Sequence, residues 1–373
     1  MFRYTALAVL ICCGVAHSAD PPASQPADQA DTYEVYFRCV LRNKTDGALD
    51  DVHVWLPVPQ DSDYQRIGAF QTELWGQPFA VERQEDRFGQ PLVRITIARL
   101  EPNQTVEVGY SCDVLLRVPP KVQLDPARAG ALEDVPADLR ALYTTDLKDI
   151  YDLSSPEIRR VAGELLAKHP NPVARALAIH DFVAGRLKYV REGGWDAAPT
   201  VLERGSGSCS EFSFLFCALC RATGLPTRFV GASNGPAAGR RARLPHEDTV
   251  LHRWAEVYLP PYGWVPFDPT ADRGEPPKRA FVGTFRPRVL IVSKRDAGPP
   301  LGQAYVVAND HPRDLEWKRA FVWTRGARAA FERATELAAA GHRDEADMAY
   351  QEIAAKYKGS RWAKAAEQRV QTK

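Results

Sequence analysis

The sequence is short of net charge, of cysteine and of calcium-binding patterns. Lysine and arginine total 48 against 47 aspartate and glutamate, which leaves a formal charge of +1 over 373 residues. Nucleic-acid-binding domains usually carry a marked basic excess, so we expect no nucleic-acid partner. Seven cysteines are too few for a disulfide-built scaffold of this length. No aspartate-rich loop has calcium-ligand spacing, and we expect no metal or other cofactor.

Long apolar runs are also missing, and the one short run lies at the N-terminus. Residues 1–18 contain an early arginine, an apolar stretch and small residues near the end, a pattern typical of a cleavable secretory signal peptide. A membrane anchor would need around 20 apolar residues, and lipid attachment at Cys12 or Cys13 is the other alternative. Residues 19–31 contain no aromatic or β-branched residue, which predicts a disordered tether. We therefore expect a secreted or periplasmic protein with no membrane span.

Period-two alternation of apolar and polar residues runs through residues 32–118. The first predicted strand has one apolar face, formed by Val35, Phe37, Cys39 and Leu41. Such runs, bounded by turn residues, predict a two-sheet, immunoglobulin-like β-sandwich. Cys39 and Cys112 both fall on the inward parity of their strands, so they form a possible disulfide, and two buried free thiols are the alternative. A linker with a short helical piece is predicted over residues 119–150.

Helical periodicity begins after this linker. Ser155-Pro156-Glu157 has the composition of a helix start, and Pro172 opens a second predicted helix that ends near Tyr189. Strands are predicted at residues 288–293 and 303–307.

Residues 325–373 form a predicted helical tail. Apolar stripes at helical spacing are broken at Gly341 and Gly359. The tail resembles a little over one tetratricopeptide repeat, although solenoids need about three repeats for stability. Its helices either pack on the preceding domain or offer a surface to a protein partner.

The segment around Cys209 carries the strongest chemical signal. A glycine-rich turn precedes Cys209, which starts a predicted helix with apolar residues on nearly every face, so this helix must lie at the centre of a domain. A thiol at a helix N-terminus experiences the positive end of the helix dipole, which favours the nucleophilic thiolate. Cys209 is therefore the candidate nucleophile. For Cys217 and Cys220, on the same helix, packing is favoured over a redox pair or half a zinc site.

Two alternating runs around residues 260–263 predict a β-hairpin. If Tyr258 pairs with Trp264, the hairpin makes His252 and Asp268 diagonal neighbours on one face, about 7–8 Å apart at Cα. A loop of even length would turn Asp268 to the other face, so this arrangement needs an odd loop or a bulge.

The hairpin and the cysteine together suggest a mechanism. His252 would take the proton of Cys209 and later protonate a leaving amine, while Asp268 fixes the tautomer of the imidazole. The backbone N–H of Cys209 would form part of an oxyanion hole.

Four sequence blocks occur in order: G-x-C-x-E-F, G-L-P-T-R-F-V, H-R-W-A-E-V-Y and G-W-V-P-F-D-P-T. Together they resemble the transglutaminase-like superfamily of papain-type folds over about residues 150–273. The resemblance implies a thiol enzyme acting on amide carbonyls, with Cys209, His252 and Asp268 as its catalytic triad. The predicted fold class is thus α+β, with a papain-like, transglutaminase-like catalytic core over residues 151–310 between the all-β sandwich and the helical tail.

Other residues near these blocks have two alternative roles, contact with the substrate or packing. Trp195 and Tyr189 are candidates for the second oxyanion donor that the family places upstream of the cysteine, and packing is the alternative for both. Ser208 is a further candidate for oxyanion or substrate contact. Arg253 stands where the family commonly has a small residue, and we expect it to narrow or charge the rim of the site.

Two further histidines of the predicted catalytic core, His246 and His180, need an interpretation beside His252. His246 is an alternative base, but it follows Pro245 in an arginine-rich loop and should be exposed. His180 lies at an apolar-stripe spacing in a predicted helix, so we expect an ordinary core or surface histidine.

Three functions remain open on the sequence. The leading hypothesis is hydrolysis of peptide or glutamine-type amides through an acyl-enzyme on Cys209. Transfer of the same acyl group to an amine, which would cross-link proteins, shares that intermediate and cannot be separated from hydrolysis by sequence. The third hypothesis is a catalytically silent protein-binding module.

Overall fold

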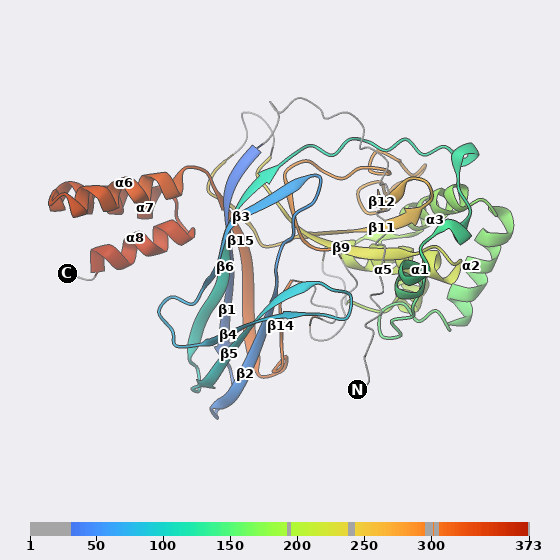
Figure 1. The fold of residues 1–373 in the computed structure, drawn as a ribbon. Helices are drawn as coiled ribbons and strands as arrows, with labels where there is room; N and C mark the ends of the chain where they lie inside the picture. The colour runs from blue at the N-terminus through green and yellow to red at the C-terminus, as the bar shows by residue number, and fades with distance from the viewer. Residues whose placement is uncertain (1–30, 192–194, 238–242, 295–300, 302–305, 372–373) are drawn as a thin grey trace, which may run out of the picture.

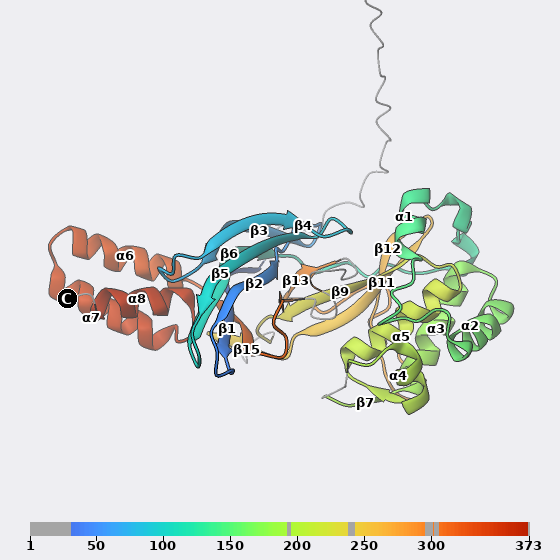
Figure 2. The ribbon, with the colours of Figure 1, turned by 90° about the horizontal axis from the view of Figure 1, so that it is seen from below.

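The structure is a computed structural model in which three units follow one another along the long direction of the molecule (Figure 1). A β-sandwich lies in the middle, a mixed α/β core lies on one side of it, and three C-terminal helices lie on the other. A second view, from below, shows the same order (Figure 2). The predicted signal peptide and nearly all of the predicted tether lie outside the described residues. The structure describes residues 31–191, 195–237, 243–294, 301 and 306–371.

The sandwich consists of two antiparallel sheets. One has the order β10-β15-β1-β6-β3 and the other β14-β2-β5-β4. Inward side chains at alternate positions, such as Val35, Phe37, Val54 and Ile95, are fully buried between them, as the period-two pattern predicts. The strands from the N-terminal region are β1 (Asp31–Asn43), β2 (Leu49–Pro57), β3 (Gln65–Glu73), β4 (Ala80–Glu85), β5 (Pro91–Leu100) and β6 (Thr105–Leu116).

The sequence analysis expected the sandwich to span residues 32–118 only, and this expectation is wrong, because later strands join it. Strand β15 (Leu315–Thr324) pairs with β1 from Glu34 opposite Thr324 to Asn43 opposite Leu315, and β10 (His246–Asp248) pairs with β15. The chain thus leaves the sandwich, forms the core and then returns to the sandwich. Strand β15 completes the inner face of the sandwich with its buried side chains Phe321 and Trp323. The predicted end of the catalytic core at residue 310 therefore does not separate the core from the sandwich, since the chain re-enters the sandwich close to this residue.

The C-terminal part of the core region differs from its prediction in one strand. Strand β13 (Val289–Ser293) forms as predicted for residues 288–293. Of the strand predicted at residues 303–307, the first three positions lie outside the described residues, and the short strand β14 (Ala308–Asn309) lies just beyond its end.

Cys39 and Cys112 are both buried, and the structure has them as free thiols. They lie on the neighbouring strands β1 and β6, but Cys39 is opposite Val108 and Cys112 is opposite Val35. This offset of four residues separates the two cysteines by about 14 Å along the strands, at roughly 3.4 Å per residue. A disulfide needs a Cα separation of about 4.4–6.8 Å, so the disulfide considered above does not form.

The core packs helices on the sheet β12-β11-β9-β13. Helix α5 lies at its centre, and every residue from Ser210 to Arg221 is buried, as the apolar pattern predicts. The predicted helix starts at Pro156 and Pro172 are both found, but the second helix ends at Arg186 because a strand pairing begins at Lys188. The helices are α2 (Pro156–Lys168), α3 (Pro172–Arg186), α4 (Ala198–Arg204) and α5 (Cys209–Ala222). The strands are β7 (Lys188–Tyr189), β8 (Ser206–Gly207), β9 (Thr227–Asn234), β11 (His252–Leu259) and β12 (Gly263–Phe267).

Residues 119–150 contain two 3-10 turns (Pro126–Arg128 and Leu132–Asp134) and the short helix α1 (Ala137–Tyr143), close to the helical piece predicted there. The N–H of Gly130 donates to the carbonyl of Pro260, so this connection packs on the tip of the β11–β12 hairpin.

The C-terminal tail forms three helices, α6 (Ala327–Ala339), α7 (Arg343–Lys356) and α8 (Arg361–Gln371). Gly341 and Gly359 adopt positive φ angles of 88° and 82°, which end the first two helices as predicted. Lys364 on α8 donates to Glu107 of the sandwich at 2.6 Å. The tail is therefore held against the sandwich, at the end of the molecule away from α5 (Figure 1).

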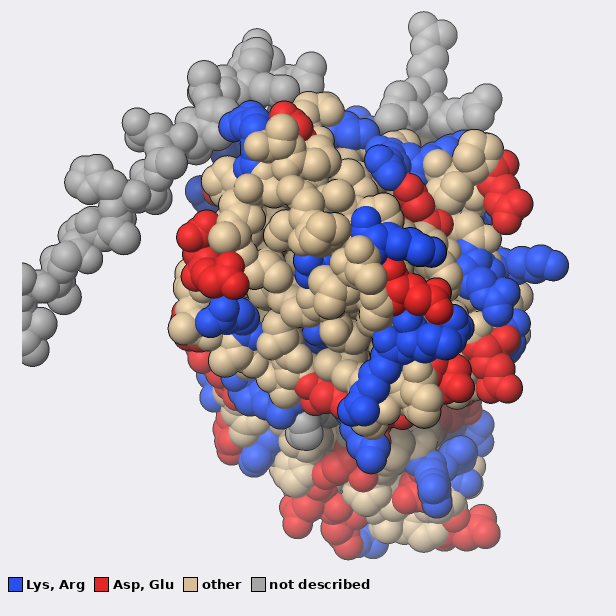
Figure 3. Space-filling view, turned by 90° about the vertical axis from the view of Figure 1, so that its right-hand side faces the viewer, with Lys and Arg blue, Asp and Glu red and all other residues tan. Residues whose placement is uncertain are grey.

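Two surface features bear on the expected partners. None of the helices in the described part of the chain is long and apolar enough to cross a membrane. On the face presented by the helices of the core, basic and acidic side chains are intermixed (Figure 3).

Candidate active site

Cys209 is the first residue of α5, and the turn before it is fixed by Glu211. The fully buried carboxylate of Glu211 accepts the backbone N–H of Ser208 at 2.7 Å and the Nη2 of Arg204 at 2.6 Å. Gly207 leaves room for this arrangement, since a Cβ there would lie 2.8 Å from the Cβ of Glu211. The motif G-x-C-x-E-F thus encodes a rigid helix start, in which the first-turn N–H groups have no acceptor within the helix.

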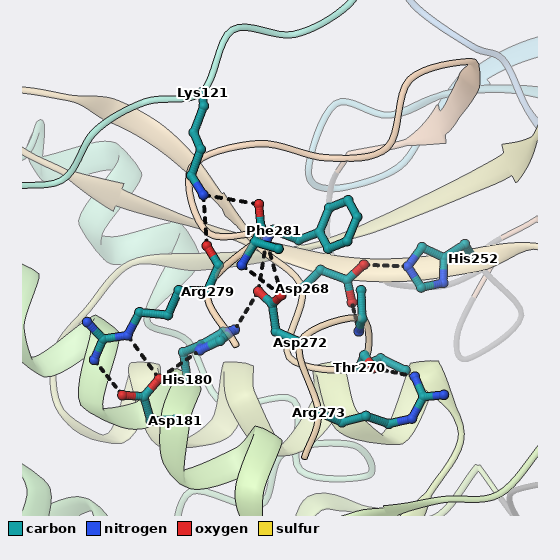
Figure 4. Close-up of polar contacts among 12 residues, drawn as sticks. Lys121, His180, Asp181, His252, Asp268, Thr270, Asp272, Arg273, Arg279 and Phe281 are labelled. Carbon is teal, nitrogen blue, oxygen red and sulfur yellow. Dashed lines mark hydrogen bonds and ion pairs between the residues drawn. The ribbon is translucent and has the colours of Figure 1, made fainter. Parts of the chain in front are cut away.

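His252 begins β11, and Asp268 directly follows β12. Tyr258 lies opposite Trp264, which is the register predicted from the sequence, and the pairing continues to Ala255 opposite Phe267. A short turn of odd length, residues 260–262, therefore brings the two side chains to one face. The Nε2 of His252 lies 2.6 Å from the Oδ2 of Asp268 (Figure 4).

The imidazole of His252 connects this hairpin to α5. Its ring interacts with the thiol of Cys209, and because Asp268 occupies Nε2, Nδ1 is the ring nitrogen left to face the sulfur. Cys209 is half-buried, whereas Asp268 is 2% exposed. The other carboxylate oxygen of Asp268 accepts the N–H of Ala271 at 2.9 Å, so the carboxylate is held on both sides.

These contacts shift the pKa values of all three groups. Burial opposes ionisation of Cys209, but the hydrogen bond and charge of His252, together with the charge of Arg253, lower the pKa of the thiol below its usual range. Burial likewise opposes the charged form of His252, but Asp268 and Cys209 raise the pKa of the imidazole to about 10. The pKa of Asp268 is lowered, despite burial, by His252 and Ala271. The arrangement therefore favours a thiolate–imidazolium pair.

The residues predicted to assist Cys209 border the same turn. Tyr189 is bridged to Gly207 through β7 and β8, and the guanidinium of Arg273 lies 4.8 Å above its ring. Trp195 has a positive φ of 57° and packs edge-on against Phe214. The structure thus places both aromatic residues near the N-terminus of α5, and their roles remain predictions.

Ser208 is the N-cap residue of α5, and its hydroxyl is buried without a hydrogen-bond partner. The structure therefore places it in the turn, next to Cys209, and its role as an oxyanion or substrate contact also stays a prediction.

Arg253 does not line the rim of the site as expected. It is 2% exposed and, as the next residue along β11, projects to the opposite face of the sheet from His252. Its Nη1 donates to the carbonyl of His252 at 2.9 Å. His246, the alternative base, is part-buried in β10, where its Nε2 lies 3.1 Å from the carbonyl oxygen of Asn234.

The remaining cysteines of α5 belong to its packed interior. Cys217 and Cys220 are fully buried in the core around this helix. Within the described residues, no group of three or more histidine, cysteine, aspartate and glutamate side chains is placed to hold a metal ion.

Several polar contacts at the site were missed by the sequence analysis. The capping pattern Ser208-x-x-Glu211 is a recognisable signal and could have been found. The buried pair of Arg228 and Glu256, at 2.5 Å, joins residues on neighbouring strands whose register was not predicted. His180 is fully buried beside Asp272, a contact between distant segments that leaves no periodic trace in the sequence.

Comparisons with known proteins agree with this geometry. Residues 159–269 match the model of the transglutaminase-like superfamily. The solved structure of a Cytophaga hutchinsonii protein with a provisional assignment as a cysteine protease has a TM-score of 0.53 and 15% sequence identity, covering 79% of this chain and 98% of that chain. This likeness shows a shared fold.

Among the curated proteins similar in sequence, two extend the comparison. An uncharacterized protein from Haemophilus influenzae is 23% identical over 295 residues, 72% of this chain and 76% of that protein. A protein-glutamine gamma-glutamyltransferase from Pseudomonas aeruginosa is 29% identical over 123 residues, 31% of this chain but only 18% of that protein. The fold and the matched region define a protein with a transglutaminase-like core. Residues 159–269 therefore form a transglutaminase-like domain, and Cys209, His252 and Asp268 all lie within the matched residues.

Proposed function

We propose that the protein is a cysteine-dependent hydrolase that acts on peptide or glutamine-type amides. The observation that carries the proposal is the placement of one imidazole, that of His252, between the thiol of Cys209 and the carboxylate of Asp268. The three groups come from the start of a helix, the start of a strand and the end of a strand. Packing of the fold alone does not require these three polar groups to lie next to one another.

The proposed reaction has two steps, formation and hydrolysis of an acyl-enzyme, and His252 transfers a proton in each of them. The thiolate of Cys209 attacks the amide carbonyl, and the resulting oxyanion lies near the free N–H groups at the start of α5. The imidazolium of His252 gives its proton to the leaving amine as the C–N bond breaks, which leaves a thioester on Cys209. The now neutral His252 takes a proton from water as that water attacks the thioester, and cleavage of the C–S bond releases a carboxylic acid and restores the thiolate of Cys209 beside the imidazolium. Asp268 stabilises the imidazolium at each stage where His252 carries the proton.

Acyl transfer to an amine is the second candidate. It follows the same path until the thioester is attacked by a primary amine in place of water. The sequence similarity of the core to part of a protein-glutamine gamma-glutamyltransferase supports this alternative. The silent binding module predicts a well-folded protein in which Cys209 forms no thioester with any amide.

The proposed location is outside the cytoplasm, in the periplasm or secreted, on the basis of the N-terminal sequence. Under this proposal the reduced state of Cys209 is maintained without a disulfide partner, since the other described cysteines are buried.

The test is incubation of the protein with glutamine-containing peptides and a fluorescent primary amine. Hydrolase activity is expected to release ammonia or a cleaved peptide without incorporation of the amine, whereas transfer would incorporate it. Both products should disappear in Cys209→Ser and His252→Ala. A product that persists in Cys209→Ser would contradict the proposed nucleophile.

A further inference from the structure

Asp268 depends on the loop that follows it, because β12 is an edge strand of the core sheet. The N–H of Asp268 donates to the carbonyl of Phe281 at 3.3 Å, and the N–H of Asp272 donates to the carbonyl of Asp268 at 3.1 Å. The chain therefore leaves β12, turns through residues 268–272 and returns beside the strand at Phe281. Any loosening of this loop would move the carboxylate that contacts His252.

Asp272 closes the loop from inside. Its fully buried carboxylate accepts the N–H of Ala280 at 2.9 Å and the N–H of Phe281 at 2.9 Å. Phe281 is the same residue whose carbonyl holds the backbone of Asp268. The position of the Asp272 carboxylate thus determines how the two arms of the loop meet (Figure 4).

His180 of α3 lies between two carboxylates. Its Nε2 is 3.3 Å from the Oδ2 of Asp272, and its Nδ1 is 3.2 Å from the Oδ1 of Asp181. Arg279, from the loop itself, binds the far side of Asp181. Figure 4 shows the resulting chain of contacts from Arg279 through Asp181 and His180 to Asp272. Helix α3 is therefore attached to the loop at two points.

The geometry around His180 indicates that its imidazole ring is protonated and positively charged. A neutral imidazole has one N–H and one lone pair, and a lone pair facing a carboxylate would be repelled. Carboxylates at both nitrogens are compatible with an imidazolium, and the Nε2–Asp272 contact has an ion-pair distance without good hydrogen-bond alignment. Burial opposes this charge, but Asp181 and Asp272 together raise the pKa of His180. The ring otherwise faces the aromatic ring of Phe267, the last residue of β12.

We propose that His180 is a positioning residue: as an imidazolium between Asp181 and Asp272, it holds the 268–281 loop in the shape that keeps Asp268 on His252. This inference rests on the proposed function, because it concerns the basicity of His252 toward Cys209. Loss of the charge on His180 would free Asp272, let Asp268 shift and weaken the His252–Cys209 pair. His180 touches neither the thiol nor a substrate.

The test is the pH dependence of alkylation of Cys209 by iodoacetamide in the full chain, with the label located by peptide mapping. In His180→Gln, the alkylation midpoint should rise by up to about one pH unit, because a charge in direct contact with the thiol would be worth at least that much and His180 acts only through Asp268 and His252. Asp181→Asn should shift the midpoint in the same direction by less, since His180 keeps Asp272. Val183→Ala is the matched control, because it lies fully buried on α3 and should lower the melting temperature without moving the midpoint.

Each outcome has one meaning. A wild-type midpoint at the value of an ordinary thiol would contradict the proposed function itself. A lowered wild-type midpoint that His180→Gln and Asp181→Asn leave unchanged would overturn only the positioning role. If His180→Gln does not fold, proton NMR of the wild type decides: two downfield ring N–H signals that move in Asp181→Asn are expected, and a single such signal would overturn the proposal.

Discussion

The His252 Nε2 and the Asp268 Oδ2 lie 2.6 Å apart, although sixteen positions of the chain separate them. The contact exists because the β11–β12 hairpin turns through an odd number of residues, which brings both side chains to the same face. The protonation state of the imidazole, and with it that of Cys209, follows from this register.

The first prediction concerns pH. The thiolate–imidazolium pair should exist between the lowered pKa of Cys209 and the pKa of about 10 of His252. Amide turnover should therefore rise as pH passes the first value and fall as pH passes the second. The proton on His252 also stabilises the fold fully below its unfolded pKa of 6.5, and this contribution is lost as pH rises through about 10. A profile of kcat/KM against pH, paired with melting temperatures, checks both.

The second prediction concerns Asp268. Asp268→Asn should leave the fold intact but lower the pKa of His252 and reduce kcat/KM by about 10⁴-fold, the size of the effect when the aspartate of a Ser-His-Asp triad is changed to asparagine. Asp138→Asn, at an exposed position on α1, is the control and should leave kcat/KM unchanged. Equal activity in the two variants would show that the contact between Asp268 and His252 has no part in the reaction.

The third prediction concerns the turn before Cys209. Gly207→Ala places a methyl group 2.8 Å from the Cβ of Glu211, so the cap should be displaced at a cost of about 1–3 kcal/mol in unfolding free energy. Alkylation of Cys209 should slow as well. Gly163→Ala, in helix α2 with open space around it, should instead raise the unfolding free energy by up to about 1 kcal/mol. Urea denaturation of both variants provides the measurement.

The fourth prediction concerns the buried pair of Arg228 and Glu256. Arg228→Met leaves the carboxylate of Glu256 buried without its partner, which should cost about 3–5 kcal/mol. The exposed pair of Arg160 and Glu164 offers the comparison, and Arg160→Met should cost no more than about 0.5 kcal/mol. Similar denaturation midpoints for the two variants would contradict this account of the pair.

The fifth prediction concerns the sandwich cysteines. Cys39 and Cys112 should both react with an alkylating reagent after denaturation without reductant, because their register places them too far apart for a bond. Mass spectrometry with and without prior reduction should give the same labels at both positions. Label that appears only after reduction would indicate a disulfide.

The part of the fold that the sequence predicts is the part governed by local periodicity. Alternation gave the strands of the sandwich, and the pairing of Tyr258 with Trp264 followed from counting residues across one hairpin. The alternation of apolar and polar residues showed that Cys39 and Cys112 face inward. It could not show how far apart they lie along the strands, because this depends on the register between strands distant in sequence. For the same reason β15 was not assigned to the sandwich.

The candidate site divides in the same way. Cys209, His252 and Asp268 belong to sequence blocks whose spacing is informative, so they could be named before the structure. The attachment of the 268–281 loop through His180 could not, because one buried polar contact between a helix and a loop changes no pattern of hydrophobicity. Arg253 is buried and does not lie at the rim, because the alternation of β11 turns it to the other face, but its charge does act on Cys209, in agreement with one of the two expectations.

The central claim is that His252 activates Cys209, and the rate of alkylation at near-neutral pH tests it most directly. In the wild type, iodoacetamide should label Cys209 rapidly, with a midpoint below that of a free thiol, and in His252→Ala the labelling should become slow and its midpoint should rise. Labelling of the wild type at the rate and midpoint of an ordinary thiol, unchanged in His252→Ala, would contradict the account.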